Sequence, residues 1–447
     1  MTDEPTKNPP DTAGVGTTEP EPEQAGGAIL ESSDPAAALT EVGATHEMPE
    51  SRFMRAIYWL TSANTFVVTV LSIFSALVIG AIMIVLANRD VMAKFGYFTA
   101  RPGDALSASW DLIRSAYTAL FQGAIYNPDA TTWRQALFPI SETLTNATPL
   151  IFTGLAVALA FRGGLFNIGA QGQAVMGAIA AGLVGFEMNL PIVLHVILAL
   201  LGAIVGGGIW GAIPGFLKAK TGAHEVIVTI MLNYIAAPAF ISWLIIQKGV
   251  QDPNRTDAIS KTVHSHADLP QFFPNTELRV NLGLVVGLLC AAFVSWLVNR
   301  STPGFEIRAV GSNPDAARTA GMSVGRTYIT LMIISGALAG LGGASLVLGT
   351  AGALTTQVAG TIGFDGITVA LLGRGKAWGV VLAAILFGAL TAGGNRMQAD
   401  AGVTNDIVAV LQAVIVIFIA APALIKSIYR LRAARTARLA TNLAKGW

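Results

Sequence analysis

The stretch FVVTVLSIFSALVIGAIMIVLA, residues 66–87, decides the fold class of this chain. It carries no charged residue, and most of its side chains are apolar. A helix rises about 1.5 Å per residue, so a run of roughly 22 residues spans the ~30 Å hydrocarbon core of a bilayer. The stretch therefore predicts a transmembrane helix, and we expect the chain to be a membrane protein.

Further apolar runs follow, and together with the first they number about ten. The run at 363–373 is too short to span a bilayer unaided. The pattern predicts an all-α integral membrane protein, a polytopic bundle of about ten transmembrane segments, some of them short or discontinuous. The later runs lie at roughly 138–161, 168–186, 192–217, 225–246, 281–299, 328–349, 363–373, 377–393 and 406–424.

The overall composition agrees with a membrane protein. Of the 447 residues, 53% are hydrophobic and 12% are charged, whereas an average soluble protein has roughly 25% charged residues. The single cysteine, Cys290, lies in an apolar run, and His264 and His266 form only a pair in a polar loop. We therefore predict no disulfide, metal site or cofactor. We also expect no nucleic-acid partner.

The two ends of the chain differ from this membrane part. Residues 1–60 are rich in Glu, Asp, Pro, Gly, Thr and Ala, and they cannot bury enough apolar surface to offset the entropy of ordering. They predict a disordered acidic cytoplasmic tail, followed by a transmembrane domain at 61–425 and a basic cytoplasmic tail at 426–447. Within 88–134, an amphipathic piece around 110–121 is expected outside the bilayer or along its surface.

Basic residues predict the orientation, because short cytoplasmic loops carry an excess of Lys and Arg. The C-terminal segment 424–447 contains basic residues and no acidic one, which places both termini in the cytoplasm. The loop at 88–137 also carries basic residues, so the asymmetry is a bias. The basic residues that this orientation puts on the cytoplasmic side are Arg162, Lys218, Lys220, Arg300, Arg308, Arg318, Arg326, Arg374 and Lys376.

Many of the 48 glycines lie inside the apolar runs, as in GAIVGGGIWGAIPG at 202–215 and SGALAGLGGASLVLG at 335–349. Small residues four positions apart let the backbones of two helices approach closely. This spacing predicts tight helix packing. The alternative is that these helices also slide or bend.

Polar residues interrupt several runs, and such residues tend to face a pathway or a partner because intramembrane polarity is costly. FNIGAQGQAVMG, residues 166–177, places Asn167, Gln171 and Gln173 at the start of a run. The glycines beside them permit a broken or re-entrant helix.

Two later runs are interrupted in the same way. EVIVTIMLNYIAAP, residues 225–238, has Asn233 in mid-run and Glu225 at its edge, where a carboxylate suits a helix N-terminus. TIGFDGITVALLGRG, residues 361–375, predicts a half-length helix with Asp365 near its start. Discontinuous helices often build midplane binding sites, and a purely structural role, with Asp365 capping its own helix, is equally compatible.

The loop RSTPGFEIRAVGSNPDAARTAGMSVGRT, residues 300–327, is the most distinctive stretch between the runs. Asn313 and Pro314 predict a helix start, Asp315 favours the positive end of the helix dipole, and Gly321 predicts the stop. A helix of such small residues has too little apolar surface to be stable alone. It is either a knob that docks into another protein or an ordinary connecting loop.

No nucleotide-binding loop is predicted. Residues 373–376 come nearest, but Ala370 replaces the first glycine of that motif and Ala377 replaces its closing Ser or Thr. Neither a Ser/His/Asp group nor paired carboxylates can be assembled. We therefore expect that the chain is not an enzyme and that its energy comes from an ion gradient or a separate ATPase.

Four ordered motifs resemble a known family. They are ETLTNATPLIFTGLAVALAFRGGLFNIGAQGQ at 142–173, EVIVTIMLNYIA at 225–236, RAVGSNPDAARTAGM at 308–322 and GFDGITVALLGRG at 363–375. The chain resembles, over about 135–425, the permease subunits of ATP-binding-cassette (ABC) importers for simple sugars, nucleosides and branched-chain amino acids. Its motifs are most similar to those of the nucleoside-type permeases.

The resemblance implies a multi-pass subunit of the plasma (inner) membrane, surrounded by lipid, that works with a cytoplasmic ABC ATPase, a second permease subunit and an extracytoplasmic substrate-binding lipoprotein. It also implies that runs 2 to 5 and 7 to 10 are inverted repeats. The short helix at 313–321 would be the coupling helix that sits in a groove of the ATPase. The residues assigned to this coupling role are Arg308, Gly311, Asn313, Pro314, Ala316, Ala317 and Gly321.

The expected mechanism is alternating access driven by ATP. Asn167, Gln171, Gln173, Asn233 and Asp365 would line the path of a neutral solute rich in hydroxyl and amide groups. Fixed counter-charges for a charged solute are scarce in the runs.

Other functions remain open at this point. A simple-sugar ABC permease has largely the same sequence motifs. An ion-coupled secondary transporter would need ionisable residues deep in several helices, and only Asp365 and Glu225 approach that description. A channel or scaffold would need no ATPase, and an intramembrane enzyme would need a catalytic group.

Overall fold

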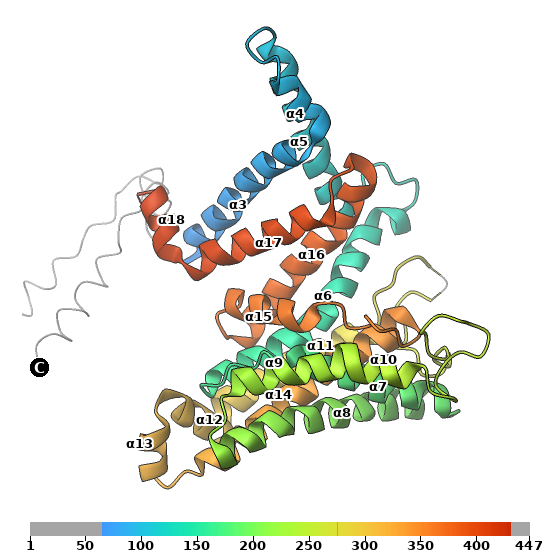
Figure 1. The fold of residues 1–447 in the computed structure, drawn as a ribbon, viewed down its shortest axis with the longest axis vertical. Coiled ribbons are helices and arrows are strands. Elements are labelled where there is room, and N and C mark those ends of the chain that lie inside the picture. Colours follow the sequence, from blue (N-terminus) through green and yellow to red (C-terminus); the bar gives the residue numbers. More distant parts are fainter. Residues whose placement is uncertain (1–64, 275, 431–447) are drawn as a thin grey trace, which may run out of the picture. The chain divides into compact units, whose positions relative to one another are not determined.

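The computed structural model describes residues 65–274 and 276–430. The predicted tail at 1–60 and most of the predicted tail at 426–447 lie outside these residues and remain predictions. The described part consists of α-helices with two short π-helical segments, η1 and η2 (Figure 1). In chain order the elements are α3 (Thr65–Ala87), α4 (Arg89–Phe95), α5 (Pro102–Ala124), α6 (Trp133–Arg162), α7 (Ala170–Glu187), α8 (Ile192–Thr221), α9 (Glu225–Tyr234), η1 (Ile235–Ile241), α10 (Ser242–Ile245), α11 (Leu282–Arg300), α12 (Thr302–Ser312), α13 (Pro314–Thr319), α14 (Val324–Leu346), η2 (Val347–Ala351), α15 (Ile362–Leu372), α16 (Ala377–Ala401), α17 (Asn405–Ala420) and α18 (Pro422–Ile428).

Every apolar run of the sequence becomes a helix, but the helices differ in whether they could cross a membrane alone. Within the described residues, seven are long and apolar enough by themselves, and the α17–α18 pair, bent by 86°, would make an eighth. Two do not qualify: α7 carries Gln171 and Gln173 among its 18 residues, and α15 has only 11 residues. The structure thus confirms a polytopic α-helical bundle. The predicted count of about ten segments includes two that are too polar or too short to span a bilayer unaided.

Glycines bring α8 and α14 into backbone contact. A β-carbon placed on Gly207 would lie 2.3 Å from the carbonyl oxygen of Gly336, far inside any allowed contact. One placed on Gly340 would lie equally close, 2.3 Å, to the carbonyl oxygen of Ala203. The tight packing predicted from the small-residue spacing is therefore confirmed.

Two long helices, α6 and α14, contact each other in the core. α6 also packs against α15 and α16, whereas α14 packs against α7 and α8. Helices α15 and α16 follow α14 in the chain as α7 and α8 follow α6. This exchange of partners is the contact pattern expected of two related repeats, and their opposite orientation stays a prediction.

The segment between α10 and α11 folds over the ends of α7 and η2. The backbone N–H of His264 donates to the carbonyl of Gly185 at 3.0 Å, and that of Leu269 donates to the carbonyl of Leu348 at 2.8 Å. The sequence predicted only a polar loop here. Long-range backbone hydrogen bonds of this kind leave no periodic signal in the sequence.

A second group of helices, α3, α5 and α17, packs beside α16. α3 lies along α17 (Figure 1), and α5 approaches α16 where the backbone of Leu120 contacts Gly393. The hydroxyl of Tyr117 donates to the carbonyl of Leu77, which joins α5 to the middle of α3.

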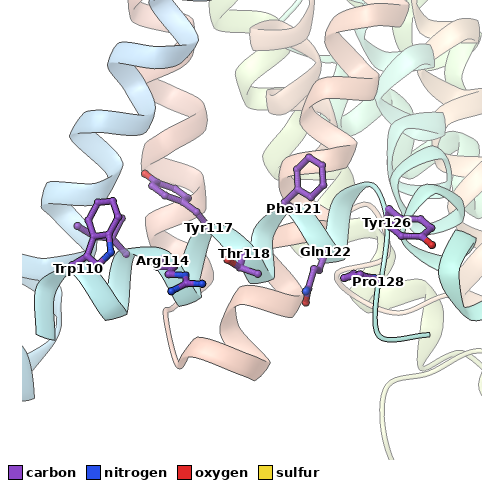
Figure 2. A pocket seen from close by; sticks show the side chains of 9 residues that line it. Trp110, Arg114, Tyr117, Thr118, Phe121, Gln122, Tyr126 and Pro128 are labelled. Atoms are coloured by element: carbon purple, nitrogen blue, oxygen red, sulfur yellow. The ribbon is translucent and has the colours of Figure 1, made fainter. Parts of the chain in front are cut away.

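An open groove of about 550 Å³ follows the outer face of α5. Figure 2 shows the aromatic side chains of Trp110, Tyr117 and Phe121 and the polar side chains of Arg114 and Gln122 along this helix, and all five line the groove. The helix expected around 110–121 is present as α5, and its place relative to the bilayer stays a prediction.

Candidate functional site

The short helix predicted at Asn313 is present as α13. The side-chain oxygen of Asn313 accepts hydrogen bonds from the backbone N–H groups of Asp315 and Ala316, both at 3.0 Å, and Pro314 occupies the first helical turn. The helix ends before Gly321, whose φ of +85° suits glycine. The start and stop signals read from the sequence are therefore confirmed.

A second helix, α12, precedes α13 in the loop that the sequence left without further structure. The hydroxyl oxygen of Ser301 accepts from the backbone N–H of Gly304 at 3.0 Å, and Pro303 lies in the first turn. Serine followed by an early proline is an ordinary helix-start signal, so this element could have been found. We call residues 301–323, which contain α12 and α13, the coupling segment, after the role that is predicted for it.

Close backbone contacts attach the coupling segment to the helix bundle. A β-carbon on Gly311 would lie 2.2 Å from the carbonyl oxygen of Arg162, so α12 touches the end of α6 directly. The guanidinium Nη1 of Arg308 donates to the carbonyl of Val298 on α11 at 2.6 Å. Two of the predicted coupling residues thus anchor the segment.

The two faces of α13 have different surroundings. Ala317 is 4% exposed and packs with Val310 and Val324 of its own chain, whereas Ala316 and Arg318 are exposed. Ala317 therefore supports the segment from within. A partner protein would meet the face that carries Ala316 and Arg318.

Four of the predicted path residues gather around the start of α7. Asn167 lies at the centre of a buried cluster, where its Nδ2 donates to Oε1 of Gln173 and to Oγ of Ser335, both at 2.8 Å. The hydroxyl of Ser335 in turn donates to the carbonyl of Ala156 on α6 at 2.7 Å. Sequence reasoning missed Ser335, because a single serine in a glycine-rich helix gives no sign of a distant partner.

Gln171 and Asn233 also form hydrogen bonds around the start of α7. Gln171 donates through Nε2 to the carbonyl of Gly360 at 2.7 Å and accepts through Oε1 from the N–H of Gly363 at 2.8 Å. Asn233 accepts through Oδ1 from the N–H of Gly172 at 2.8 Å and donates through Nδ2 to the carbonyl of Ile168 at 3.0 Å. All four amides are at most 6% exposed, so in this structure they bind the chain itself.

Asp365 lies apart from these amides, near the start of α15. Its carboxylate accepts a hydrogen bond from the hydroxyl of Thr361 at 2.8 Å. Thr356, Gln357 and Thr361 are exposed and Asp365 is half-buried, so the turn into α15 carries a polar surface. Gln171, through its bond to Gly360, ties this surface to the amide cluster.

Comparison with known proteins assigns this chain to a family. A family model described as branched-chain amino acid transport system / permease component matches residues 140–420. This chain belongs to that permease family. The match includes the coupling segment, the amide cluster and α15, and it leaves α3 to α5 outside.

Individual relatives of this permease are similar over most of their length. A guanosine ABC transporter permease protein of Bacillus subtilis is 42% identical over 309 residues, 69% of this chain and 86% of that one. A nucleoside ABC transporter permease protein of Lactococcus lactis subsp. cremoris is 39% identical over 290 residues, 63% and 79% of the two chains. A glucose ABC transporter permease protein of Haloferax volcanii is 34% identical over 290 residues, 63% and 76%. No solved structure matches the permease.

In this permease, the two groups of predicted site residues approach each other at a backbone contact. Gly311 of the coupling segment touches the last residue of α6, Arg162, and Asn167 follows only a short glycine-containing turn later. Contacting backbone therefore links the coupling segment to the turn before α7.

Proposed function

We propose that this permease is the translocating subunit of an ATP-driven importer of nucleosides. The observation that carries the proposal is its likeness to a guanosine and a nucleoside ABC permease at 42% and 39% identity. The exposed face of α13, held out from the bundle by α12, supplies the surface on which an ATPase would act.

The same proposal assigns the partners and the location. ATP hydrolysis belongs to a separate cytoplasmic ABC ATPase that receives α13, and an extracytoplasmic lipoprotein delivers the solute. A second permease subunit completes the path. The chain lies in the plasma (inner) membrane with both termini in the cytoplasm, which agrees with the basic residues at Arg162, Arg308 and Lys376.

The path itself is proposed to follow the start of α7 and the turn into α15. In this conformation a solute would meet the exposed side chains of Thr356 and Gln357 and the hydrogen-bonded pair of Thr361 and Asp365. The buried amides, Asn167, Gln171, Gln173 and Asn233, would meet the solute only when the start of α7 separates from α9, α14 and α15. Hydroxyl and amide groups suit the hydroxyls of a ribose and the edges of a base.

Uptake by native cells tests this proposal. Cells with and without the gene receive radiolabelled uridine or adenosine, with excess ribose, xylose or leucine as competitors and with ATP depleted in parallel. We expect the gene to supply ATP-dependent nucleoside uptake that these competitors leave unchanged. Uptake that survives ATP depletion but collapses with an uncoupler would instead indicate an ion-coupled transporter.

A simple-sugar importer is the second proposal, supported by the 34% identity to the glucose permease. It predicts that deletion removes sugar uptake and leaves nucleoside uptake intact, so uptake of radiolabelled ribose or xylose by the same cells separates the two.

A further inference from the structure

A cleft of about 310 Å³ opens between the ends of α6, α11 and α16. These three helices contact one another, and the cleft lies where α6 and α11 end and α16 begins. It lies at the same end of the bundle as the coupling segment, because Arg162 lines the cleft and its carbonyl touches Gly311. None of the roles proposed above uses this cleft.

The mouth of the cleft carries two cations. Arg162 and Lys376 are both exposed, and neither forms an ion pair within residues 65–274 and 276–430. The Nε of Arg162 donates to the carbonyl of Gly375 at 3.1 Å, which holds the guanidinium beside Lys376. Two such charges close together attract an anion.

The rest of the lining is largely apolar. Leu159 of α6 and Val294 and Val298 of α11 line the cleft and are buried, and Ser295 of α11 lines it and is half-buried. Trp378 lines the cleft too and is 52% exposed, as expected of a tryptophan at a membrane interface. A soluble phosphate would use only the mouth, whereas a phospholipid matches both the charges and the walls.

We propose that this cleft binds an anionic phospholipid, with the phosphate between Arg162 and Lys376 and an acyl chain along the apolar wall of α11. Basic pockets between membrane helices on the cytoplasmic side are suited to such headgroups. The proposal concerns lipid binding alone and does not depend on which solute is transported.

Native mass spectrometry of the purified complex tests the proposal with two lipids of matched chains, phosphatidylglycerol and phosphatidylcholine. We expect at least tenfold greater retention of phosphatidylglycerol. The Arg162→Gln and Lys376→Gln variants should each weaken it about fivefold, the effect of one basic residue near an anionic surface. Lys220→Gln is the matched control, because Lys220 is an exposed basic residue on α8 outside the cleft.

A second variant tests the space in the cleft independently of the two cations. Ser295→Phe fills the cleft but leaves both cations, so it should abolish lipid retention even if a charge variant fails to fold. Equal retention of phosphatidylglycerol by the original chain, the double charge variant and Ser295→Phe would overturn the proposal. Displacement by millimolar glycerol 3-phosphate would assign the cleft to a soluble anion. If the charge variants no longer co-purify with the ATPase but retain lipid as before, the two cations would instead be assigned to a protein contact.

Discussion

At the scale of single residues, the site contains both buried amides, which bind partners within the chain, and exposed polar side chains. Asn167 and Gln173 are 0% and 1% exposed and pair with each other, while Thr356 and Gln357 remain exposed. A buried polar group that loses its partner destabilises the fold by about 1–3 kcal/mol, whereas removing both partners can be nearly neutral.

This asymmetry predicts the stability of two variants. Asn167→Leu leaves the amide of Gln173 buried without its partner, so we expect about 1–3 kcal/mol of destabilisation. The double variant Asn167→Leu, Gln173→Leu should be more stable than the single one, because no unpaired amide remains. Thermal unfolding in detergent measures both. A double variant that loses as much as two independent substitutions would show that the pairing is unimportant.

Neighbouring glycines give a sharper contrast. A β-carbon at Gly207 would lie 2.3 Å from a backbone oxygen of α14, but one at Gly208 would find its first neighbour at 3.6 Å. We expect Gly207→Ala to destabilise the protein by about 1–3 kcal/mol through overpacking and Gly208→Ala to be nearly neutral. The monodispersity of each variant after heating measures this difference. Equal monodispersity of the two variants would contradict the close backbone contact.

At the scale of elements, α13 is a helix whose existence depends on its caps and its support. It has only 6 residues, too few for an isolated helix to be stable. The side chain of Asn313 satisfies its first N–H groups, and Ala317 packs into the small cluster with Val310 and Val324. The cap and this packing therefore hold α13 against the rest of the chain.

Adjacent residues of α13 separate docking from support. Ala316→Arg changes the exposed face, so we expect loss of ATPase co-purification and at least tenfold less uptake with normal thermal stability. Ala317→Arg forces a charge into the small cluster, so stability should fall as well. Normal ATP-dependent uptake by Ala316→Arg would count against α13 as the coupling helix.

At the scale of the whole molecule, the structure has two distinct ends. The ends of α6, α8 and α11 lie with the coupling segment, and α7 and η2 contact the segment 263–269. Lys218 on α8 pairs with Glu225 at 2.9 Å across the first of these ends. The bias of basic residues predicts that this end faces the cytoplasm.

Cysteine labelling tests that orientation. In a Cys290→Ala background, His266→Cys should react with a membrane-impermeant maleimide in intact cells or spheroplasts. Thr319→Cys should react only in inside-out vesicles. Both positions are exposed, so accessibility alone does not separate them. The reverse pattern would invert the topology and remove α13 from the cytoplasm.

Much of the site could be predicted from short-range patterns. Asn313, Pro314 and Gly321 identified α13 because capping depends on residues a few positions apart. Asn167, Gln171, Gln173 and Asn233 were found as polar interruptions, but their partners were not. Ser335, Gly360 and Gly363 lie far away in the chain, and only packing brings them to the start of α7.

The sequence by itself determined that the chain is a helical membrane protein, because hydrophobic length and glycine spacing act along a single helix. It also indicated the family through four local motifs. Only the tertiary structure decided which helices touch, that four path amides are satisfied within the chain, and that Arg162 and Lys376 share one cleft. These features depend on the rotation and packing of each helix, which neighbouring helices set and local sequence does not.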